Sequence, residues 1–333
     1  MKLSQVGEFE LIKQIRSNLR DFQRRVVVGI GDDAALVKIP PQELLLSTTD
    51  TLVENVHFNW DYASPFQVGW KVLAINISDI AAMGGKPTYC LISLAMSRDT
   101  KKSLVNELYG GLKRIASLYK IDIIGGDLVY SPVFTVTICL LGEVNKDNFI
   151  LRSGAKKGDL IYVTGDLGAS KAGLIYLEGF NAKKKREGAF FIKKHLMPCP
   201  KLKEGQQIAK SKLSNAMIDI SDGLISDLSH IAEESGVGAV IWEEKIPLNP
   251  SVRKLAKELK TSPLNWALYG GEDYELLFTV LKNKKRILEE SLCFSPILIG
   301  EIVDEKEGLN LIDTSGKKIK LKKRGYDHFK KVD

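Results

Sequence analysis

The sequence predicts an α+β fold divided into two domains of similar size. Its 333 residues exceed the length of one ordinary domain. Strand-like and helical segments follow one another in a mixed order, which favours antiparallel neighbours over a doubly wound parallel sheet. The pattern restarts after a turn-rich connection, Arg152–Asp159. We therefore place the boundary between residues 149 and 159 and expect domains at 1–150 and 151–333.

The elements of the first half follow from apolar periodicity. Phe9, Ile12 and Ile15 recur at helical spacing and predict the first helix. Apolar runs between turn signals predict strands. We expect helices at 9–19, 66–83 and 101–119, and strands at 26–30, 44–47, 89–96, 121–124 and 133–141. Gly84-Gly85 is expected to end the second helix.

The second half repeats the alternation of strands and helices. We expect strands at 160–164, 216–220, 239–242 and 276–280, and helices at 169–177, 205–211 and 224–234. Two heptapeptides, Ala74–Ile80 and Met217–Gly223, share an apolar alternation that ends in Ser-Asp. This similarity suggests two related halves, each bringing an acidic turn to a shared site.

Composition favours a folded protein with real cores, because 44% of the residues are hydrophobic and 27% are charged. No segment has the roughly 20 apolar residues of a membrane span, and the start resembles no signal peptide, so we expect a cytoplasmic protein. The net charge is +7, and the basic runs Lys183–Arg186 and Lys317–Arg324 lack interleaved aromatic residues. We interpret both runs as solvated surface and expect no nucleic-acid partner. The four cysteines are widely spaced, which predicts buried, reduced thiols rather than zinc or disulfides: Cys90, Cys139, Cys199 and Cys293.

The most informative feature is a set of carboxylates that follow apolar segments beside glycine, serine or threonine. They occur in five turns: Asp32-Asp33, Thr48-Thr49-Asp50, Asp79, Asp127, and Asp219 with Asp222. Carboxylates brought together repel one another, so a cluster requires cations, basic partners or full solvation. Oxygen ligands of this kind suit Mg²⁺ or Mn²⁺. Glycines such as Gly29, Gly31, Gly125 and Gly126 allow the backbone to approach phosphate oxygens.

A plainer interpretation is available for each turn taken alone. Asp79 and Asp222 each follow a serine and are expected to open a helix, where an aspartate is a good N-cap. Five such turns in one chain nevertheless favour a metal site. The chain has no P-loop and no kinase catalytic loop. His57 lies just past the Thr49-Asp50 turn and is either structural or part of a site, whereas Gly270–Glu275 is interpreted as a substrate wall.

The motifs together resemble the thiamine-monophosphate kinase family of the PurM-like superfamily. The stretches that carry the resemblance, in order, are GEF, GIGDDAAL, STTDTLVENVHF, INISDIAAMGG, IIGGD, LRSGAKKGDLIYVTG, IDISDGLISDL, YGGEDYELLFTV and GYDHF. The resemblance implies an N-terminal mixed or antiparallel sheet domain that dimerises and a C-terminal α/β domain. It also implies ATP and several Mg²⁺ ions in a cleft, and a reaction that converts thiamine monophosphate to thiamine diphosphate.

The resemblance also assigns residues. The implied metal ligands are Asp33, Thr48, Thr49, Asp50, Asp79, Asp127, Asp219 and Asp222. The implied ATP contacts are Tyr109, Gly126, Arg152 and Ser221, and the implied substrate contacts are His57, Glu272 and Tyr326. Asp32 is held in reserve, and nothing transfers to Lys183–Arg186.

The implied mechanism is direct phosphoryl transfer without a phosphoenzyme, because the acceptor is a phosphate oxygen that is already ionised. No general base or covalent residue is then required. Aminoimidazole ribonucleotide synthetase is the alternative enzyme within the superfamily. Two other relatives are disfavoured. Selenophosphate synthetase needs a reactive cysteine or selenocysteine near its N-terminus, and this chain has no cysteine before Cys90. The hydrogenase-maturation relative has a C-terminal cysteine tail, whereas this chain ends in HFKKVD. A non-catalytic Mg-nucleotide sensor is the alternative from another class.

Overall fold

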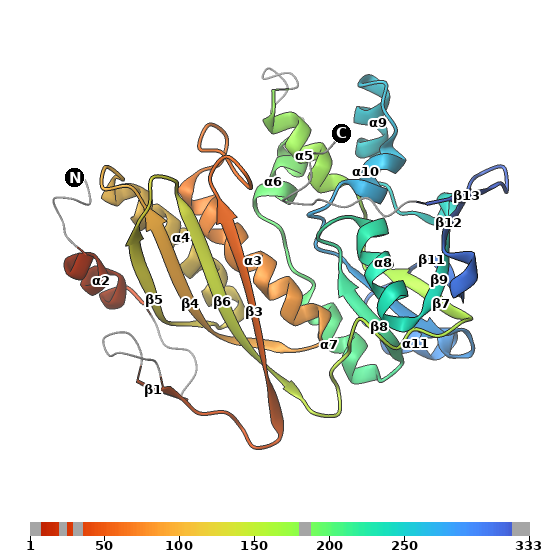
Figure 1. The fold of residues 1–333 in the computed structure, drawn as a ribbon, viewed down its shortest axis with the longest axis horizontal. Coiled ribbons are helices and arrows are strands. Elements are labelled where there is room, and N and C mark those ends of the chain that lie inside the picture. The colour runs from red at the N-terminus through yellow and green to blue at the C-terminus, as the bar shows by residue number, and fades with distance from the viewer. Residues whose placement is uncertain (1–7, 20–24, 29–35, 180–187, 322–333) are drawn as a thin grey trace. The chain divides into compact units, whose positions relative to one another are not determined.

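The computed structural model describes residues 8–19, 25–28, 36–179 and 188–321. Within it the chain forms two compact units (Figure 1). The first comprises residues up to Ile80 and Gly85–Asp147, and the second comprises Ala81–Gly84 and the residues from Asn148 onward. Several predicted features lie outside the described residues: Gly29, Gly31, Asp32, Asp33, Lys183–Arg186, Lys322–Arg324 and Tyr326.

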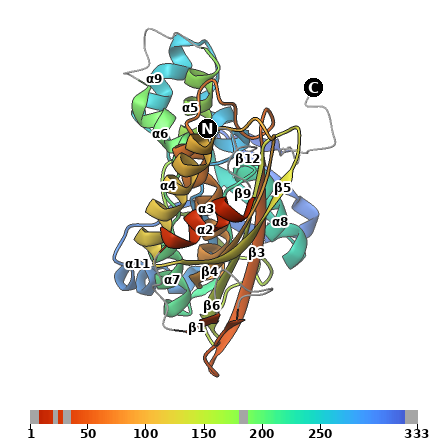
Figure 2. The ribbon, with the colours of Figure 1, turned by 90° about the vertical axis from the view of Figure 1, so that its left-hand side faces the viewer.

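The first unit contains a four-stranded sheet in the order β3-β6-β4-β5. Its strands are β3 (Glu43–Val53), β4 (Lys86–Met96), β5 (Asp122–Tyr130) and β6 (Thr135–Asn145). β6 pairs antiparallel with β3 and β4, whereas β4 and β5 are parallel and are joined through helix α4 (Lys102–Tyr119). α4 and α3 (Pro65–Ala82) cover one face of the sheet (Figures 1 and 2). The unit also holds α2 (Glu8–Ser17), β1 (Val26–Val28) and β2 (Leu36–Val37).

Helices α3 and α4 approach each other so closely that only glycine fits at two crossing points. A Cβ added to Gly69 on α3 would lie 2.0 Å from the carbonyl oxygen of Leu108. A Cβ added to Gly111 on α4 would lie 1.9 Å from the carbonyl oxygen of Phe66. Because real Cβ atoms do not come this near to backbone, the two glycines set the spacing of the helices. That spacing fixes the position of α3, and with it Asp79, over the sheet.

The second unit contains a seven-stranded sheet in the order β13-β12-β9-β11-β7-β10-β8. All of its neighbouring strands pair antiparallel except β12 and β9. The strands are β7 (Asp159–Val163), β8 (Ser214–Asp219), β9 (Val237–Trp242), β10 (Leu276–Leu281), β11 (Ile297–Asp304), β12 (Leu309–Ile312) and β13 (Lys318–Lys320). The helices are α5 (Ala169–Leu177), α6 (Ala189–Leu196), α7 (Leu202–Ser211), α8 (Leu224–Ser235), α9 (Pro250–Glu258), α10 (Pro263–Tyr269) and α11 (Lys285–Ser291). Short 3₁₀ turns are η2 (Glu243–Lys245), η3 (Lys282–Lys284) and η4 (Glu305–Glu307).

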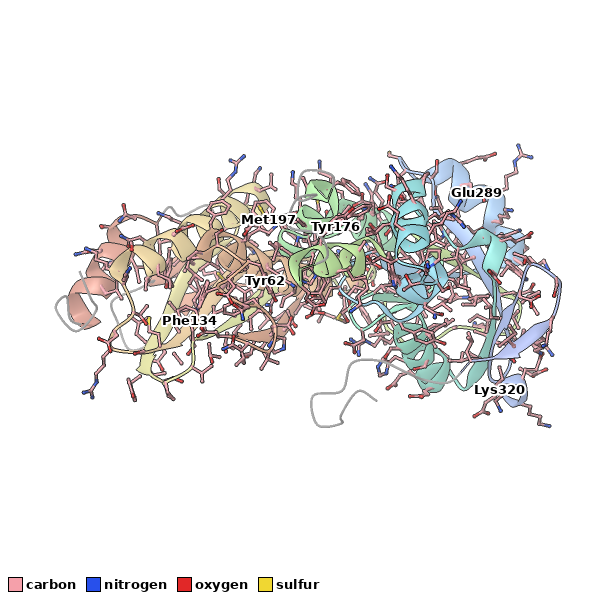
Figure 3. All side chains as sticks on the ribbon, turned by 90° about the horizontal axis from the view of Figure 1, so that it is seen from above. Tyr62, Phe134, Tyr176, Met197, Glu289 and Lys320 are labelled. Atoms are coloured by element: carbon pink, nitrogen blue, oxygen red, sulfur yellow. The ribbon has the colours of Figure 1, made fainter. Side chains whose placement is uncertain are left out.

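Two apolar clusters hold the second unit together. The larger packs α8 on the sheet and includes Ile218, Leu224 and Leu277, which are almost fully buried. The smaller gathers α5, α6, α9 and α10, and Tyr176 (labelled in Figure 3) stacks on Phe191 with ring centroids 6.2 Å apart. The two clusters fix the ends of β8 and α5, where the candidate site residues of this unit lie.

The α+β class with mixed, mainly antiparallel sheets is confirmed. The helix expected at 169–177 has those limits, and the strand expected at 44–47 continues to Val53. The prediction that Asp79 opens a helix is wrong, because Asp79 lies in the last turn of α3. The suggested duplication also fails: Ala74–Ile80 is helical, whereas Met217–Gly223 is a strand followed by a turn.

The prediction that the four cysteines are buried is correct for only some of them. None of the four cysteines, all of which are in the described part of the chain, forms a disulfide. Cys90 is buried, but Cys199 and Cys293 are exposed. Lys317–Lys320 are exposed, as expected for a solvated basic run. Within the described residues, no helix combines the length and apolar character needed to cross a membrane.

Candidate active site

Strand β3 and helix α3 bring two predicted metal ligands together in the first unit. The Thr48 hydroxyl donates a hydrogen bond to Asp79 Oδ2 at 2.5 Å. Asp79 stands at the C-terminal end of α3, where the helix dipole disfavours a negative charge. A hydroxyl donor beside it offsets part of that cost, and a bound cation would offset more. The oxygen-only character of this pair fits a hard divalent cation.

The pairing of residues between neighbouring strands shows which other predicted ligands lie on the same face of the sheet as Thr48. Asp50 pairs with Ile138, which pairs with Ile92, which pairs with Gly126. Paired residues point to the same face, so Asp50 and Gly126 share the helix-covered face with the buried Ile138. The register therefore brings a predicted metal ligand and a predicted ATP contact to one row.

Asp127 and Thr49 fall on the other face of the sheet. Asp127 is exposed and pairs with Ser93 on β4, one position beyond Ile92. Its Oδ1 accepts the backbone N–H of Leu128 at 2.9 Å. The Thr49 hydroxyl donates to the carbonyl oxygen of Ile138 at 2.9 Å. The first unit thus divides its predicted ligands between two faces, and the metal role of these two residues stays a prediction.

The remaining predicted residues of the first unit are Tyr109 and His57. Tyr109 on α4 is only 8% exposed, and burial raises the pKa of its phenol. His57 Nδ1 accepts the backbone N–H of Val53 at 3.1 Å, so the ring is held against the end of β3. Phe134, labelled in Figure 3, packs edge-on against Trp60 beside this segment, with ring centroids 5.2 Å apart. The contacts of both residues with ligands stay predictions.

In the second unit, one buried carboxylate organises the turn that carries Asp219 and Asp222. Asp227 Oδ2 accepts the backbone N–H groups of Ser221, Asp222 and Gly223 at 3.1, 3.2 and 3.1 Å. Asp227 lies in the first turn of α8 and is 2% exposed. It therefore caps its own helix from within and fixes the turn. Asp227 was not predicted as a site residue; the signal for it in the sequence is an acidic residue in the first turn of a helix.

The three aspartates of this turn repel one another. Burial raises the pKa of Asp227 well above its ordinary value, and the charges of Asp219 and Asp222 raise it further. Asp219 is 2% exposed at the end of β8. Such crowding of oxygen donors suits a hard cation. Among the described residues, however, no group of three or more His, Cys, Asp or Glu side chains is already arranged to hold a metal ion.

Arg152 lies beside the strand that leads to this turn. The backbone N–H of Met217 on β8 donates to the carbonyl oxygen of Leu151 at 2.9 Å, which holds the preceding residue of the connection against β8. Arg152 itself is exposed. An exposed guanidinium at this place is available for a phosphate group.

The Gly270–Glu275 turn is tied directly to the Asp222 turn. The backbone N–H of Glu272 donates to the carbonyl oxygen of Ser221 at 2.7 Å, and that of Tyr274 donates to Ile220 at 2.9 Å. Gly271 and Glu272 have φ angles of 62° and 57°, and a Cβ on Gly271 would lie 2.8 Å from the Ser221 carbonyl oxygen. The structure therefore brings together Ser221, a predicted ATP contact, and Glu272, a predicted substrate contact.

Glu275, the last residue of this turn, lines a cavity of about 280 Å³. Its wall includes Lys201 and Glu275, whose Nζ and Oε1 atoms are 3.1 Å apart. Thr164 donates to Glu275 Oε2 at 2.7 Å. Burial lowers the pKa of Lys201, but the charge of Glu275 and its hydrogen bond raise it, with a net increase. Lys201 could not be predicted from local sequence, because its partner Glu275 is 74 positions away in the chain.

Known proteins resemble the chain over nearly its whole length. The model of the AIR synthase related protein N-terminal domain matches residues 31–144, and that of the C-terminal domain matches residues 156–310. A thiamine-monophosphate kinase from Buchnera aphidicola (subsp. Schizaphis graminum) is 42% identical over 97% of this chain and 99% of its own length. The Bacillus subtilis enzyme of the same name is 40% identical over 98% and 100%. The chain belongs to the thiamine-monophosphate kinase family.

Solved structures agree with the family assignment. A relative described as AaThiL complexed with AMPPCP and TMP has a TM-score of 0.77 and 36% identity, covering 99% of both chains. The hydrogenase-maturation protein HypE of Escherichia coli shares the fold, with a TM-score of 0.74, but only 18% of the sequence. As a member of the thiamine-monophosphate kinase family, the chain is an enzyme with the two-domain PurM-like fold.

One half-buried acid of this kinase has a pKa near neutrality. Asp273 accepts the backbone N–H groups of Gly168 and Ser170 at 2.6 and 3.1 Å, at the start of α5. Burial raises its pKa from an ordinary 3.8 to about 7, although these two N–H groups oppose the increase. The folded chain therefore holds this proton more tightly than the unfolded chain does.

We expect Asp273 to make the kinase less stable as the pH rises from about 4 to about 7, with no further change from this group above pH 7. Between about pH 4 and pH 7, the free energy of unfolding of Asp273→Asn should fall by up to about 4 kcal/mol less than that of the wild type. Urea denaturation at pH 4.5, 6 and 7.5 measures it. Parallel pH profiles for the two proteins would contradict the assignment.

Proposed function

We propose that this kinase transfers the γ-phosphate of ATP to thiamine monophosphate in a direct, in-line, magnesium-assisted step that gives ADP and thiamine diphosphate. The similarity to thiamine-monophosphate kinases along the whole chain supports the substrates. The observation that carries the proposal is the backbone hydrogen bond of 2.7 Å between Glu272 and Ser221, which joins the predicted substrate and ATP contacts in one rigid turn.

The donor set supports magnesium rather than a softer metal. The residues that would hold Mg²⁺ offer only carboxylate and hydroxyl oxygens: Asp33, Thr48, Thr49, Asp50, Asp79, Asp127, Asp219 and Asp222. When bound, the ions would screen the repulsion between the donor and acceptor phosphates. Burial is the main cause of the raised pKa of Asp227, and the charges of Asp219 and Asp222 add to it. A cation beside Asp219 and Asp222 would relieve that repulsion.

The chain's own groups position the two substrates. The exposed guanidinium of Arg152 neutralises phosphate oxygens, and Ser221, Gly126 and Tyr109 are the remaining ATP contacts of the proposal. Glu272, His57 and Tyr326 contact the thiamine part. Because the acceptor oxygen is already ionised, no side chain has to remove a proton, and no residue becomes phosphorylated.

A substrate panel tests the function. The purified chain receives ATP and Mg²⁺ with thiamine monophosphate, thiamine, a pyrimidine phosphate or the substrate of aminoimidazole ribonucleotide synthetase, and ADP release is measured. We expect release only with thiamine monophosphate. Release with the ribonucleotide precursor would favour the alternative enzyme. Nucleotide binding without ADP release from any acceptor would favour a non-catalytic sensor.

We also propose a homodimer formed through the uncovered face of the four-stranded sheet. This face carries half-buried and exposed side chains such as Thr51, Thr137 and Cys139, and the first two hydroxyls are 2.8 Å apart. Small side chains with satisfied hydroxyls suit close sheet-to-sheet contact.

Cys139→Arg is expected to convert the dimer to a 37.0 kDa monomer, because a charge in the centre of the contact loses its hydration without gaining a partner. Light scattering coupled to gel filtration measures the mass. Leu118→Arg on the exposed side of α4 is the matched control and should leave the dimer intact. A monomeric wild-type chain, or a dimeric Cys139→Arg variant, would contradict this interface.

A further inference from the structure

His195 is a buried histidine that the proposed mechanism does not use. It lies in the last turn of α6 and is 4% exposed. Its Nδ1 atom is 3.0 Å from Glu272 Oε2 and 3.0 Å from Ser170 Oγ. A buried ring nitrogen shared between a carboxylate and a hydroxyl fixes the orientation of both partners.

The carboxylate that His195 contacts is held on a rigid backbone. Glu272 has a φ of 57° and donates its N–H to the Ser221 carbonyl oxygen. The next residue, Asp273, is anchored to the N–H groups of Gly168 and Ser170. The main chain on both sides of the Glu272 side chain is therefore held in place. Its side chain is still 29% exposed, so a ligand can reach it.

The packing of α5 against α6 in turn fixes His195. The backbone of α6 packs directly against Gly173 on α5. A Cβ added to Gly173 would lie 2.2 Å from the Phe191 carbonyl oxygen. The same Cβ would lie 2.9 Å from the Cβ of His195. Because the helices meet backbone to backbone at this point, the imidazole has a defined place above Ser170. The ring is thus a fixed support in direct contact with the Glu272 carboxylate.

We propose that His195 is a positioning residue that holds the Glu272 carboxylate in the orientation that binds the thiamine part of the substrate. The inference rests on the proposed function, in which Glu272 contacts the substrate. Thiamine carries a positive charge and an amino group, so a carboxylate ordered in advance gains affinity by avoiding the entropy cost of ordering on binding. Binding of ATP does not involve this contact.

Steady-state kinetics on matched variants tests the role. His195→Leu fills the buried space without a ring nitrogen, whereas His195→Asn keeps an amide nitrogen on the same γ carbon. We expect His195→Leu to raise the KM for thiamine monophosphate about tenfold, with kcat and the KM for ATP within about twofold. His195→Asn should recover most of the loss. Lys193→Ala, exposed on the same helix, is the control and should match the wild type.

A double-mutant cycle separates positioning from packing. In a Glu272→Gln background, His195→Leu should add little to the KM, because the group on which His195 acts has already been changed. Equal effects of His195→Leu in the two backgrounds would overturn the inference, as would a lowered melting temperature with an unchanged KM. Either result would make His195 a packing residue.

A spectroscopic measurement tests the contact without turnover. In ¹⁵N-histidine NMR spectra, Glu272→Gln should shift the Nδ1 resonance of His195, and Glu258→Gln should leave it unchanged. An unshifted resonance would overturn the inference. If the wild-type chain forms no thiamine diphosphate, the proposed function fails and takes this inference with it. If the wild-type chain forms thiamine diphosphate and His195→Leu has an unchanged KM, the role of His195 is contradicted while the proposed function stands.

Discussion

Asp222→Asn and Asp50→Asn should each lower kcat by about 100- to 1,000-fold or more, while the fold stays intact. Asparagine keeps the shape of the side chain and removes the negative charge. At the turn after β8 the lost charge also relieves the repulsion among Asp219, Asp222 and Asp227, which adds to the effect of burial in raising the pKa of Asp227. We therefore expect Asp222→Asn to be inactive but at least as stable as the wild type. This combination is expected when a carboxylate serves function at some cost in stability.

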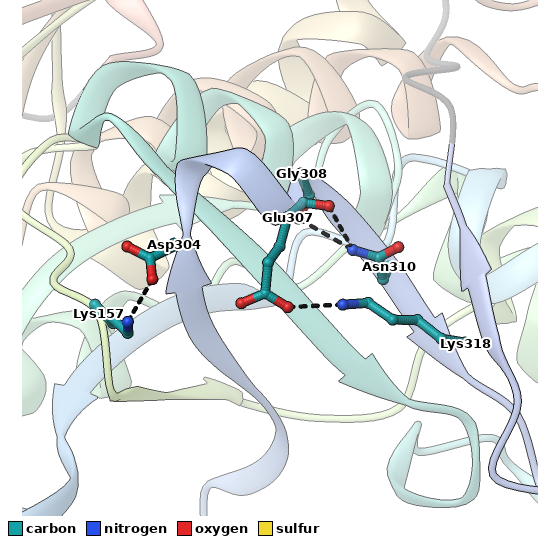
Figure 4. Close-up of polar contacts among 6 residues, drawn as sticks. All are labelled: Lys157, Asp304, Glu307, Gly308, Asn310 and Lys318. Atoms are coloured by element: carbon teal, nitrogen blue, oxygen red, sulfur yellow. Dashed lines mark hydrogen bonds and ion pairs between the residues drawn. The ribbon is translucent and has the colours of Figure 1, made fainter.

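The measurements are ADP release with thiamine monophosphate and the thermal melting temperature. Asp304→Asn is a suitable control, since Asp304 forms an exposed ion pair with Lys157 on the surface of the second unit (Figure 4). Solvent-exposed pairs of this kind contribute little to stability, so this variant should keep both activity and melting temperature. Near-normal turnover by Asp222→Asn or Asp50→Asn would remove that residue from the set of metal ligands.

Gly111→Ala should destabilise the first unit by roughly 3 kcal/mol or more, whereas Gly110→Ala should be neutral or stabilise it by about 0.5–1 kcal/mol. The two glycines are neighbours on α4. A Cβ at position 111 would lie 1.9 Å from the Phe66 carbonyl oxygen, so α3 and α4 must separate. A Cβ at position 110 would meet only the Phe66 ring, at 3.5 Å, which is ordinary contact. Alanine also favours the helix over glycine there.

Urea denaturation of the two variants, followed by circular dichroism, measures both effects in parallel. Gly69→Ala on the facing helix should behave like Gly111→Ala, because its Cβ would lie 2.0 Å from the Leu108 carbonyl oxygen. Equal stabilities for the two α4 variants would show that the helices do not cross as described. Since Asp79 is carried by α3, Gly111→Ala should also reduce activity in any fraction that remains folded.

Much of the fold could be predicted from the sequence where local pattern and packing agree. The helix at 169–177 and the strand at 276–280 were of this kind: the helix contributes Ala169, Ala172 and Tyr176 to the smaller apolar cluster, and the strand contributes Leu277 to the larger one. Elements that were not predicted from the sequence include α6, α9, α10, α11, β11, β12 and β13. Several of these are short: α10 and α11 have 7 residues each and β13 has 3, so their periodicity is weak.

The candidate site was predictable in its residue types but not in its supports. The Ser-Asp pattern was interpreted as a helix start at Asp79, whereas the helix expected at 66–83 already placed Asp79 near its end, where the structure has it. Apolar spacing runs through Asp79 into Ile80 and Ala81, and this continuity decides the helix. Asp227 and His195 were missed because their roles depend on backbone groups and on partners that only the tertiary fold brings near.

The most direct measurement is a ³¹P NMR time course of the purified chain with ATP, Mg²⁺ and thiamine monophosphate. Signals for ADP and thiamine diphosphate should grow in equal amounts, and they should stop when the divalent cation is chelated. The loss of ATP to inorganic phosphate while thiamine monophosphate stays unchanged, or the same product formed at full rate without any divalent metal, would contradict this assignment.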